Sequence, residues 1–180
     1  MKTLIINGSP RKNGDTMYFI NKIKESIECD VASAYHMDFS PCIDCRECTK
    51  GECIYKDEMT KLLNNIDNYD NIIVATPLYY NQPTGVLMAM MSRTQMFFLR
   101  GKKLKEKKGY VIVVGGGDSV INSADAEKTV RIMLMGLNVK VKGYVRCLHT
   151  SSVKPCNDTG AKEELNNIIN ELSEGMDFDI

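Results

Sequence analysis

Residues 2–16 read KTLIINGSPRKNGDT. The apolar run at residues 2–7 predicts a buried β-strand, because β-branched side chains bounded by turn residues are typical of one. Gly8-Ser9-Pro10 ends that strand, and apolar residues spaced by three and four predict a helix over residues 15–29. A strand, a short loop and a helix in this order indicate the first unit of an α/β fold.

The same alternation continues along the chain. Further strands are predicted at residues 30–35, 71–76, 109–114 and 139–145, and further helices after an N-cap at Asp57 or Thr60 and over residues 84–99, 124–137 and 160–172. Apolar, β-branched strands favour a parallel sheet that helices cover on both faces. We expect one domain over residues 1–180, with the doubly wound strand order 2-1-3-4-5 and a ligand at the carboxyl ends of the strands. The basic residues 102–108 are expected to form a solvated loop.

The composition of the chain limits the classes of function that we expect. Among 180 residues, 23 are Lys or Arg and 23 are Asp or Glu, so charge gives no argument for binding nucleic acid or an acidic membrane. No apolar run approaches the ~20 residues that span a bilayer, and the first one is too short for a secretory signal. We therefore expect a cytoplasmic protein, in which clustered cysteines are metal or redox sites rather than disulfides.

The chain has seven cysteines, and four of them follow the spacing C-x2-C-x2-C-x4-C: Cys42, Cys45, Cys48 and Cys53. Three thiolates at successive steps of three residues surround one point and the fourth closes the loop, which suits a [4Fe–4S] cubane. Zinc suits this spacing less well, because four-cysteine zinc sites usually pair two C-x2-C units across a longer span. Bound zinc and unmetallated thiols are the two alternatives. The other three are expected to be small buried hydrophobic residues: Cys29, Cys147 and Cys156.

Three predicted loops should meet at the carboxyl edge of the sheet. The first, residues 8–16, leads into a helix N-terminus, where exposed backbone N–H groups make a natural phosphate cradle. Ser9, Asn13 and Thr16 can donate hydrogen bonds to phosphate oxygens, and Arg11 adds charge. The loop lacks the Gly-Lys-Ser/Thr of a Walker A loop and the spacing of a dinucleotide-binding loop. An ordinary β-to-α turn with a helix cap is the alternative.

The second loop, residues 77–85, reads PLYYNQPTG and can flank a planar ring and hydrogen-bond to its edge. The third, residues 115–118, reads GGGD and allows the backbone to approach a ligand closely. A proline-bounded surface turn and a loose glycine turn are the alternatives. Together the three loops predict a pocket for a mononucleotide with a planar head.

These segments carry a family resemblance. They are NGSPR at residues 7–11, NGDT at residues 13–16, the cysteine motif followed by DEM, and TPLYY at residues 76–80. In their order and spacing the chain resembles, over about residues 1–120, the flavodoxin-like NAD(P)H-dependent FMN reductases, and within them the iron–sulfur flavoproteins. The resemblance implies a flavodoxin-like fold, FMN as the cofactor and NAD(P)H as a candidate electron donor.

The resemblance also implies the site residues. The FMN phosphate would be held by Ser9, Pro10, Arg11, Asn13, Asp15 and Thr16. The isoalloxazine ring would contact Pro77, Leu78, Tyr79, Tyr80, Asn81, Gly115, Gly116, Gly117 and Asp118. In iron–sulfur flavoproteins the compact cysteine motif ligates a [4Fe–4S] cluster close to the FMN, usually across a subunit interface, and the four clustered cysteines match that motif. Many cluster-free relatives also keep several cysteines here.

The chain departs from the family pattern in the helix after the second loop. Relatives often have Lys-x-x-x-Asp-Arg there, whereas residues 88–93 read MAMMSR and keep only Arg93. What that charged set does in this chain is open. Helical spacing indicates that the methionines of this region belong to the core or to a subunit interface: Met88, Met90, Met91 and Met96.

The sequence therefore predicts an FMN-dependent oxidoreductase that passes electrons between FMN and a [4Fe–4S] cluster. We expect no catalytic side chain, since His36 and His149 are isolated and the cofactors carry the chemistry. The expected partners are further copies of the chain in a homodimer or homotetramer and a redox partner such as a ferredoxin, or a small-molecule acceptor. Three alternatives remain: a cluster-free NAD(P)H-dependent FMN or quinone reductase, a flavodoxin-type electron carrier, and a sensor with structural zinc.

Overall fold

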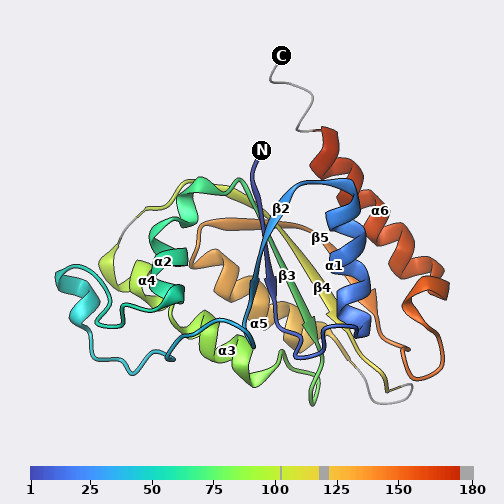
Figure 1. Ribbon diagram of the computed structural model, residues 1–180, viewed down its shortest axis with the longest axis horizontal. Coiled ribbons are helices and arrows are strands. Elements are labelled where there is room, and N and C mark those ends of the chain that lie inside the picture. Colours follow the sequence, from blue (N-terminus) through green and yellow to red (C-terminus); the bar gives the residue numbers. More distant parts are fainter. Residues whose placement is uncertain (102, 118–121, 175–180) are drawn as a thin grey trace.

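The computed structural model describes residues 1–101, 103–117 and 122–174. Within these residues a five-stranded parallel sheet has the order β2-β1-β3-β4-β5 (Figure 1). Its strands are β1 (Thr3–Asn7), β2 (Cys29–Ser33), β3 (Asn71–Pro77), β4 (Lys107–Val114) and β5 (Val139–Cys147). The predicted doubly wound order is confirmed, and it brings the carboxyl ends of the strands to one edge of the sheet.

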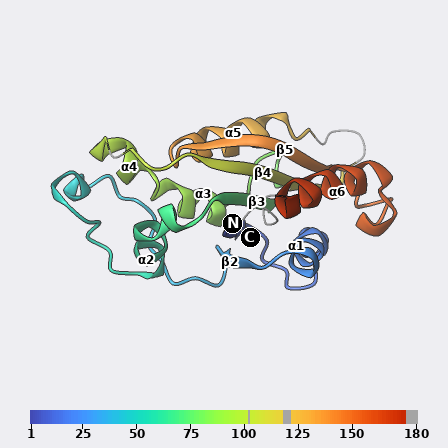
Figure 2. The same ribbon diagram turned by 90° about the horizontal axis from the view of Figure 1, so that it is seen from above.

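Helices connect the strands and cover both faces of the sheet. In the described part of the chain they are α1 (Asp15–Ser26), α2 (Glu58–Asn64), α3 (Gly85–Ser92), α4 (Gln95–Arg100), α5 (Ala124–Met135) and α6 (Thr159–Glu174). Single 3₁₀ turns occur at η1 (Glu47–Lys50), η2 (Ile66–Asn68) and η3 (Pro155–Asn157). Figure 2 shows α5 and α6 on opposite sides of β4 and β5.

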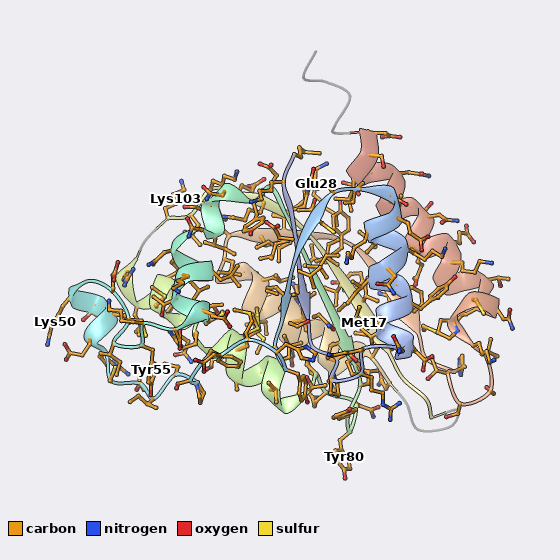
Figure 3. The ribbon with its side chains drawn as sticks, in the orientation of Figure 1. Met17, Glu28, Lys50, Tyr55, Tyr80 and Lys103 are labelled. Carbon is orange, nitrogen blue, oxygen red and sulfur yellow. The ribbon has the colours of Figure 1, made fainter. Side chains whose placement is uncertain are left out.

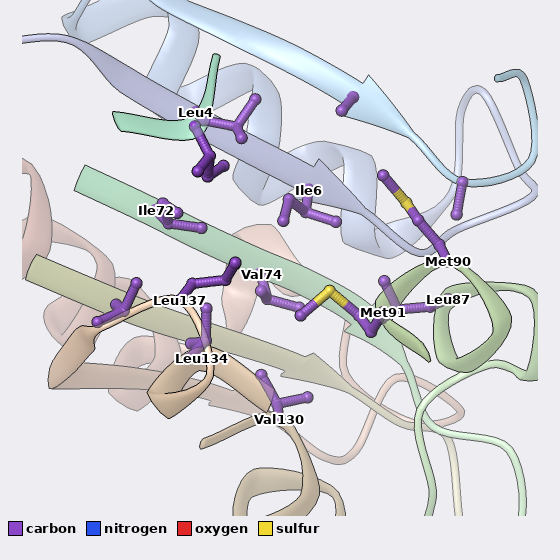
Figure 4. Close-up of a cluster of buried hydrophobic side chains, with 14 of the residues drawn as sticks. Leu4, Ile6, Ile72, Val74, Leu87, Met90, Met91, Val130, Leu134 and Leu137 are labelled. Carbon is purple, nitrogen blue, oxygen red and sulfur yellow. The ribbon is translucent and has the colours of Figure 1, made fainter. Parts of the chain in front are cut away.

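Alternation along the strands divides the core into two halves. Leu4 and Ile6 of β1 belong to a cluster with residues of α3 and α5 (Figure 4) and of α2 and α4. Ile5 between them packs with α1 and α6. All three side chains are almost completely buried, and each such burial contributes about 1.5–3 kcal/mol. Three of the methionines after the second loop are buried in the first half, which confirms the core interpretation for Met90, Met91 and Met96.

The single helix predicted over residues 84–99 is wrong, because the chain turns between α3 and α4. The hydroxyl groups of Ser92 and Thr94 donate to the carbonyls of Ala89 and Met91, at 2.6 and 2.8 Å. Hydroxyl side chains that bond to helix carbonyls in this way favour a bend. The backbone follows with bonds over three residues, from Arg93 N to Met90 O and from Thr94 N to Met91 O.

Two expectations about exposure are also wrong. Lys107 belongs to β4 rather than to a solvated loop, and its buried Nζ donates to Asp67 Oδ1 and to the Lys105 carbonyl, both at 2.8 Å. Residue 102 of that predicted loop lies outside the described residues. Cys147 is buried as expected, but Cys29 is half-buried and Cys156 is exposed. No helix in the described part of the chain has the length and apolar character that crossing a bilayer requires.

Candidate cofactor cleft and cysteine site

A cleft of about 320 Å³ opens at the carboxyl edge of the sheet. All three predicted loops contribute to its wall, and so does a fourth loop that follows β5. The lining residues are Ser9, Pro10, Arg11, Gly14, Asp15, Thr16, Pro77, Leu78, Tyr79, Val114, Gly115, Gly116, Thr150 and Ser151. The topology therefore brings together segments as far apart in the sequence as Ser9 and Ser151.

The loop after β1 is fixed by its own polar groups. Asn7 Oδ1 accepts from the backbone N–H of Ser9 at 2.8 Å, and Ser9 Oγ accepts from that of Arg11 at 3.2 Å. The Gly8 carbonyl accepts from Thr84 Oγ1 at 2.8 Å, which joins this loop to the start of α3. A Cβ at Gly8 would lie 2.8 Å from Leu87 Cδ2, so only glycine allows α3 to pack this closely.

The N-terminus of α1 faces the cleft without a side-chain cap. Its N-cap is Gly14, whereas α2 and α3 are capped by the side chains of Asp57 and Thr84. The first N–H groups of a helix need acceptors, and the helix dipole adds positive potential there. Asp15 and Thr16 of this first turn line the cleft. The arrangement suits an anion such as a phosphate.

The second loop forms a tight hairpin at the rim of the cleft. Tyr79 and Gln82 exchange both backbone hydrogen bonds, at 2.9 and 3.0 Å, around Tyr80 and Asn81. These two central residues have φ of 54° and 61°, the signature of a type I′ turn, which is usually built from Asn and Gly. The Tyr80 side chain is fully exposed and points away from the molecule (Figure 3). Tyr79 therefore lines the cleft, but Tyr80 does not.

Thr150 and Ser151 also line the cleft, although they belong to none of the predicted loops. The Thr150 N–H donates to the Gly115 carbonyl at 3.0 Å, so the loop after β5 lies against the loop after β4. A Cβ at Gly116 would lie 2.8 Å from Ser151 Oγ. The available signal was the run of hydroxyl residues at 150–152, which follows the predicted strand at residues 139–145 after four residues.

Several predicted site residues do not line the cleft. Asn13 is an exposed residue of the first loop, and Tyr80 and Asn81 form the tip of the hairpin. Gly117 does not belong to the lining either, and Asp118 lies outside the described residues. The remaining predicted cofactor residues come together in the one cleft.

The four cysteines of the motif line a second, much smaller cavity of about 20 Å³. Its other walls are mainly apolar and include Ile43, Met96 and Leu99. Burial raises the pKa of the Cys48 thiol, Arg100 opposes this, and the other three clustered thiols add to the rise. The four thiols are therefore close enough to interact electrostatically. Among the described residues, however, no group of three or more His, Cys, Asp or Glu side chains is close enough to hold a metal ion.

Arg93, the residue retained from the family pattern, forms one wall of this cavity. Its side chain is 1% exposed, and it donates to Asp57 Oδ2 at 2.6 Å and to Asp57 Oδ1 at 3.1 Å. It also donates to the Ser40 carbonyl at 2.7 Å and to Thr60 Oγ1 at 2.6 Å. Ser40 precedes the cysteine motif and Asp57 follows it. The Arg93 guanidinium therefore links the two ends of the cysteine loop.

Charge and burial oppose each other in this ion pair. Burial alone raises the pKa of Asp57, but hydrogen bonds from Arg93, Thr60 N and Ser40 N outweigh it and hold the pKa well below its usual range. Burial lowers the pKa of Arg93, but the Asp57 carboxylate and the Cys53 thiol outweigh it and raise the pKa. Both side chains therefore stay charged. The guanidinium also lies over the Tyr55 ring, 5.0 Å from its centroid.

The cleft and the cysteine cavity lie in different parts of the molecule. In Figure 3, Lys50 and Tyr55 of the cysteine loop lie at one side, and Tyr80 at the rim of the cleft lies at the bottom. Helices α2, α3 and α4 stand between the cysteine loop and the sheet (Figure 1).

The family model described as NADPH-dependent FMN reductase matches residues 1–146. The chain belongs to the NADPH-dependent FMN reductase family. The resemblance inferred from the sequence motifs is thereby confirmed.

Relatives within this family include iron–sulfur flavoproteins. One from Archaeoglobus fulgidus is 29% identical over 121 residues, 64% of this chain and 60% of that protein. Another from Methanocaldococcus jannaschii is 33% identical over 123 residues, 64% of this chain and 62% of that protein. The chain thus spans about three fifths of the length of these relatives.

A solved structure of the NAD(P)H:quinone oxidoreductase from Methanothermobacter marburgensis has the same fold. The TM-score is 0.67 at 14% identity, and the match covers 100% of this chain and 98% of that one.

Proposed function

We propose that this protein is an FMN-dependent oxidoreductase that binds FMN in the cleft at the carboxyl edge of the sheet. The observation that carries the proposal is the uncapped N-terminus of α1 in the wall of a cleft that four loops line. Membership of the NADPH-dependent FMN reductase family supports it and makes NAD(P)H the candidate electron donor. Bound FMN accepts electrons in pairs and releases them singly.

Different residues of the cleft would bind different parts of FMN. The backbone N–H groups at the start of α1 and the hydroxyls of Ser9 and Thr16 bind the phosphate, and Arg11 adds charge. Pro77, Leu78 and Tyr79 would contact the isoalloxazine ring, and so would the backbone at Gly115 and Gly116. Thr150 and Ser151 supply further hydrogen bonds. No side chain is needed as acid or base, because the cofactor carries the chemistry.

We further propose that the cysteine loop holds a [4Fe–4S] cluster through Cys42, Cys45, Cys48 and Cys53. The four side chains share one cavity, which supports a common ligand. Two buried guanidinium nitrogens near this cavity, Arg93 Nε and Arg100 Nη2, make no well-formed hydrogen bond among the described residues, and a sulfur-rich anion would accept from them. A cluster-free reductase is the second candidate, because the described thiols do not form a ready metal site.

The separation of the two sites favours electron transfer between subunits. If the cluster of one protomer serves the FMN of another, the chain works as a homodimer or homotetramer. A ferredoxin-like protein or a small molecule would then exchange electrons with the cluster or with the flavin. One domain over residues 1–180 would contain both sites of each protomer.

The flavin proposal is tested by comparing FMN with riboflavin, which lacks the phosphate. We expect the protein to bind FMN more tightly, as measured by quenching of flavin fluorescence. Arg11→Met should weaken FMN binding and leave riboflavin binding unchanged, because Arg11 lines the cleft. Lys12→Met is the matched control, since Lys12 is its exposed neighbour outside the lining. Equal affinity for the two flavins would overturn the proposed phosphate site.

The cluster proposal is tested by a spectrum and by iron, sulfide and zinc analysis of protein purified without oxygen. We expect about four irons and four sulfides per chain beside the flavin. Cys45→Ser should lose iron and keep FMN, because the cysteine loop and the cleft are separate parts of the molecule. Flavin without iron, even after anaerobic reconstitution, would favour the cluster-free reductase.

A further inference from the structure

We propose that Arg93 and Arg100, here called the arginine pair, are built to receive the anionic sulfur group of the cysteine site and to favour its reduced state. The part of the proposal that concerns reduction rests on the proposed [4Fe–4S] cluster. The part that concerns anion binding rests on the positions of the two guanidinium groups, that of Arg93 in the cavity wall and that of Arg100 against the Cys48 carbonyl.

Arg93 carries the first unsatisfied donor. Both of its terminal nitrogens are fully engaged with Ser40, Asp57 and Thr60. Its Nε is buried without a well-formed hydrogen bond among the described residues, and Cys53 of the motif lies near the guanidinium. A buried donor of a charged group that lacks a partner destabilises the folded state. The fold tolerates this cost at a position where the same residue lines the cysteine cavity.

Arg100 carries the second unsatisfied donor. Its Nε donates to the Cys48 carbonyl at 2.7 Å, so its guanidinium is held against the cysteine loop. Its Nη2 is buried without an acceptor among the described residues. Within the described ranges, two other buried side-chain atoms also lack a hydrogen-bond partner. They are Asn71 Oδ1 and Tyr110 Oη, and both residues belong to strands of the sheet. Unsatisfied cationic donors therefore gather around the cysteine loop.

A thiolate-ligated cluster is the acceptor that fits these donors. Its sulfurs carry net negative charge, and N–H donors with positive charge form strong hydrogen bonds to such groups. The negative charge increases when the cluster gains one electron, a step in which no bond forms or breaks. Hydrogen bonds and charges around the sulfurs set the reduction potential, so the arginine pair should raise it. The electron comes from the reduced flavin in the proposed function and from dithionite in the test.

The first test measures the midpoint potential of the reconstituted cluster in a dithionite titration followed by electron paramagnetic resonance. Arg100→Met should lower the potential, and Arg100→Lys should lower it less, because it keeps the charge. Lys56→Met is the matched control, since Lys56 lies in the same loop but is exposed and paired with Glu52 at 2.6 Å. A full cluster with an unchanged potential in Arg100→Met would overturn the proposal.

The second test uses the reduced, metal-free protein and therefore does not depend on the cluster. In a Cys29→Ser/Cys156→Ser background, the thiols are reacted with dianionic 5,5′-dithiobis(2-nitrobenzoate) and with neutral 4,4′-dithiodipyridine. Arg100→Met should lower the ratio of the two rates several-fold, and Lys56→Met should leave it unchanged. If the protein takes up no iron but the ratio falls, the cluster proposal fails and anion binding by the arginine pair stands. Equal ratios in all three proteins would overturn the inference.

Discussion

Gly8 is the residue on which the position of the cofactor loop depends most directly. A Cβ there would lie 2.8 Å from Leu87 Cδ2 and 3.1 Å from Thr76 Oγ1. We expect Gly8→Ala to lower the free energy of unfolding by about 1–3 kcal/mol, the usual cost of overpacking. FMN affinity should fall as well, because the displaced loop carries Ser9. Urea unfolding of the apoprotein and a flavin titration measure the two effects.

Gly85→Ala provides the control for this substitution. Gly85 is the first residue of α3, and a Cβ there would meet nothing within 4 Å. Alanine in a helix is more stable than glycine by about 0.5–1 kcal/mol, so this variant should be as stable as the parent or slightly more stable. If both substitutions destabilise equally, close packing at Gly8 is not the cause.

Asp57 connects the stability of the protein to pH. Its pKa is depressed in the folded state, so its contribution to stability is present above about pH 4, the ordinary carboxyl value, and is lost as the pH falls below that. Asp57→Asn leaves the Arg93 guanidinium buried without its counter-ion and should cost about 3 kcal/mol at pH 7. The difference between parent and variant should shrink as the pH is lowered from 4 to 2.

Urea unfolding at several pH values measures this difference. Asp44→Asn is a suitable control, because Asp44 also pairs with an arginine, at 3.1 Å, but at an exposed position where solvent screens the charges. A gap between the parent and Asp57→Asn that does not change with pH would contradict the assignment.

At the scale of elements, the hairpin after β3 separates two neighbouring tyrosines. Tyr80→Asn should keep the free energy of unfolding or raise it by up to about 1 kcal/mol, because asparagine adopts positive φ more readily than tyrosine. It should not change FMN affinity, since Tyr80 does not line the cleft. Tyr79→Ala should weaken FMN binding. Loss of FMN in Tyr80→Asn would show that the exposed ring folds back over the bound flavin.

The elements also show what the sequence can and cannot predict. Strand order and the first three loops were predictable, because glycine and proline mark the strand ends and parallel strands end at one edge. The hydroxyl residues Thr150 and Ser151 gave no such mark, and only the contact with Gly115 brings them to the cleft. The turn at Thr94 depends on local hydroxyl-to-carbonyl bonds that the spacing of apolar residues does not reveal. The burial of Lys107 depends on a tertiary partner, Asp67.

The cysteine loop is a second example of tertiary contacts that the sequence pattern does not predict. Spacing alone indicated that the four cysteines share a site, and they do line one cavity. Spacing did not indicate that Arg93 joins Ser40 to Asp57 and closes the loop, because these residues are up to 53 positions apart. The retained arginine of the family pattern acquires a role only when the fold brings α3 beside the loop.

For the molecule as a whole, the two separate sites make the oligomeric state a decisive property. Three large apolar side chains are mostly exposed on α4 and α5: Phe98, Ile132 and Met135. Phe98 and Met135 line one groove, and Ile132 lies one turn before Met135 on the same helix. A subunit contact would cover such a patch.

We expect the parent protein to form a dimer or a larger assembly in sedimentation equilibrium. Phe98→Glu and Met135→Glu should shift it to monomers, because each places a charge in the apolar contact. Val153→Glu introduces the same charge at a less exposed apolar residue outside the patch and should leave the assembly intact. If the proposed transfer between subunits is correct, the monomeric variants keep flavin and iron but pass electrons between them more slowly. A monomeric parent protein with fast transfer would contradict this arrangement and would require both cofactors to communicate within one chain.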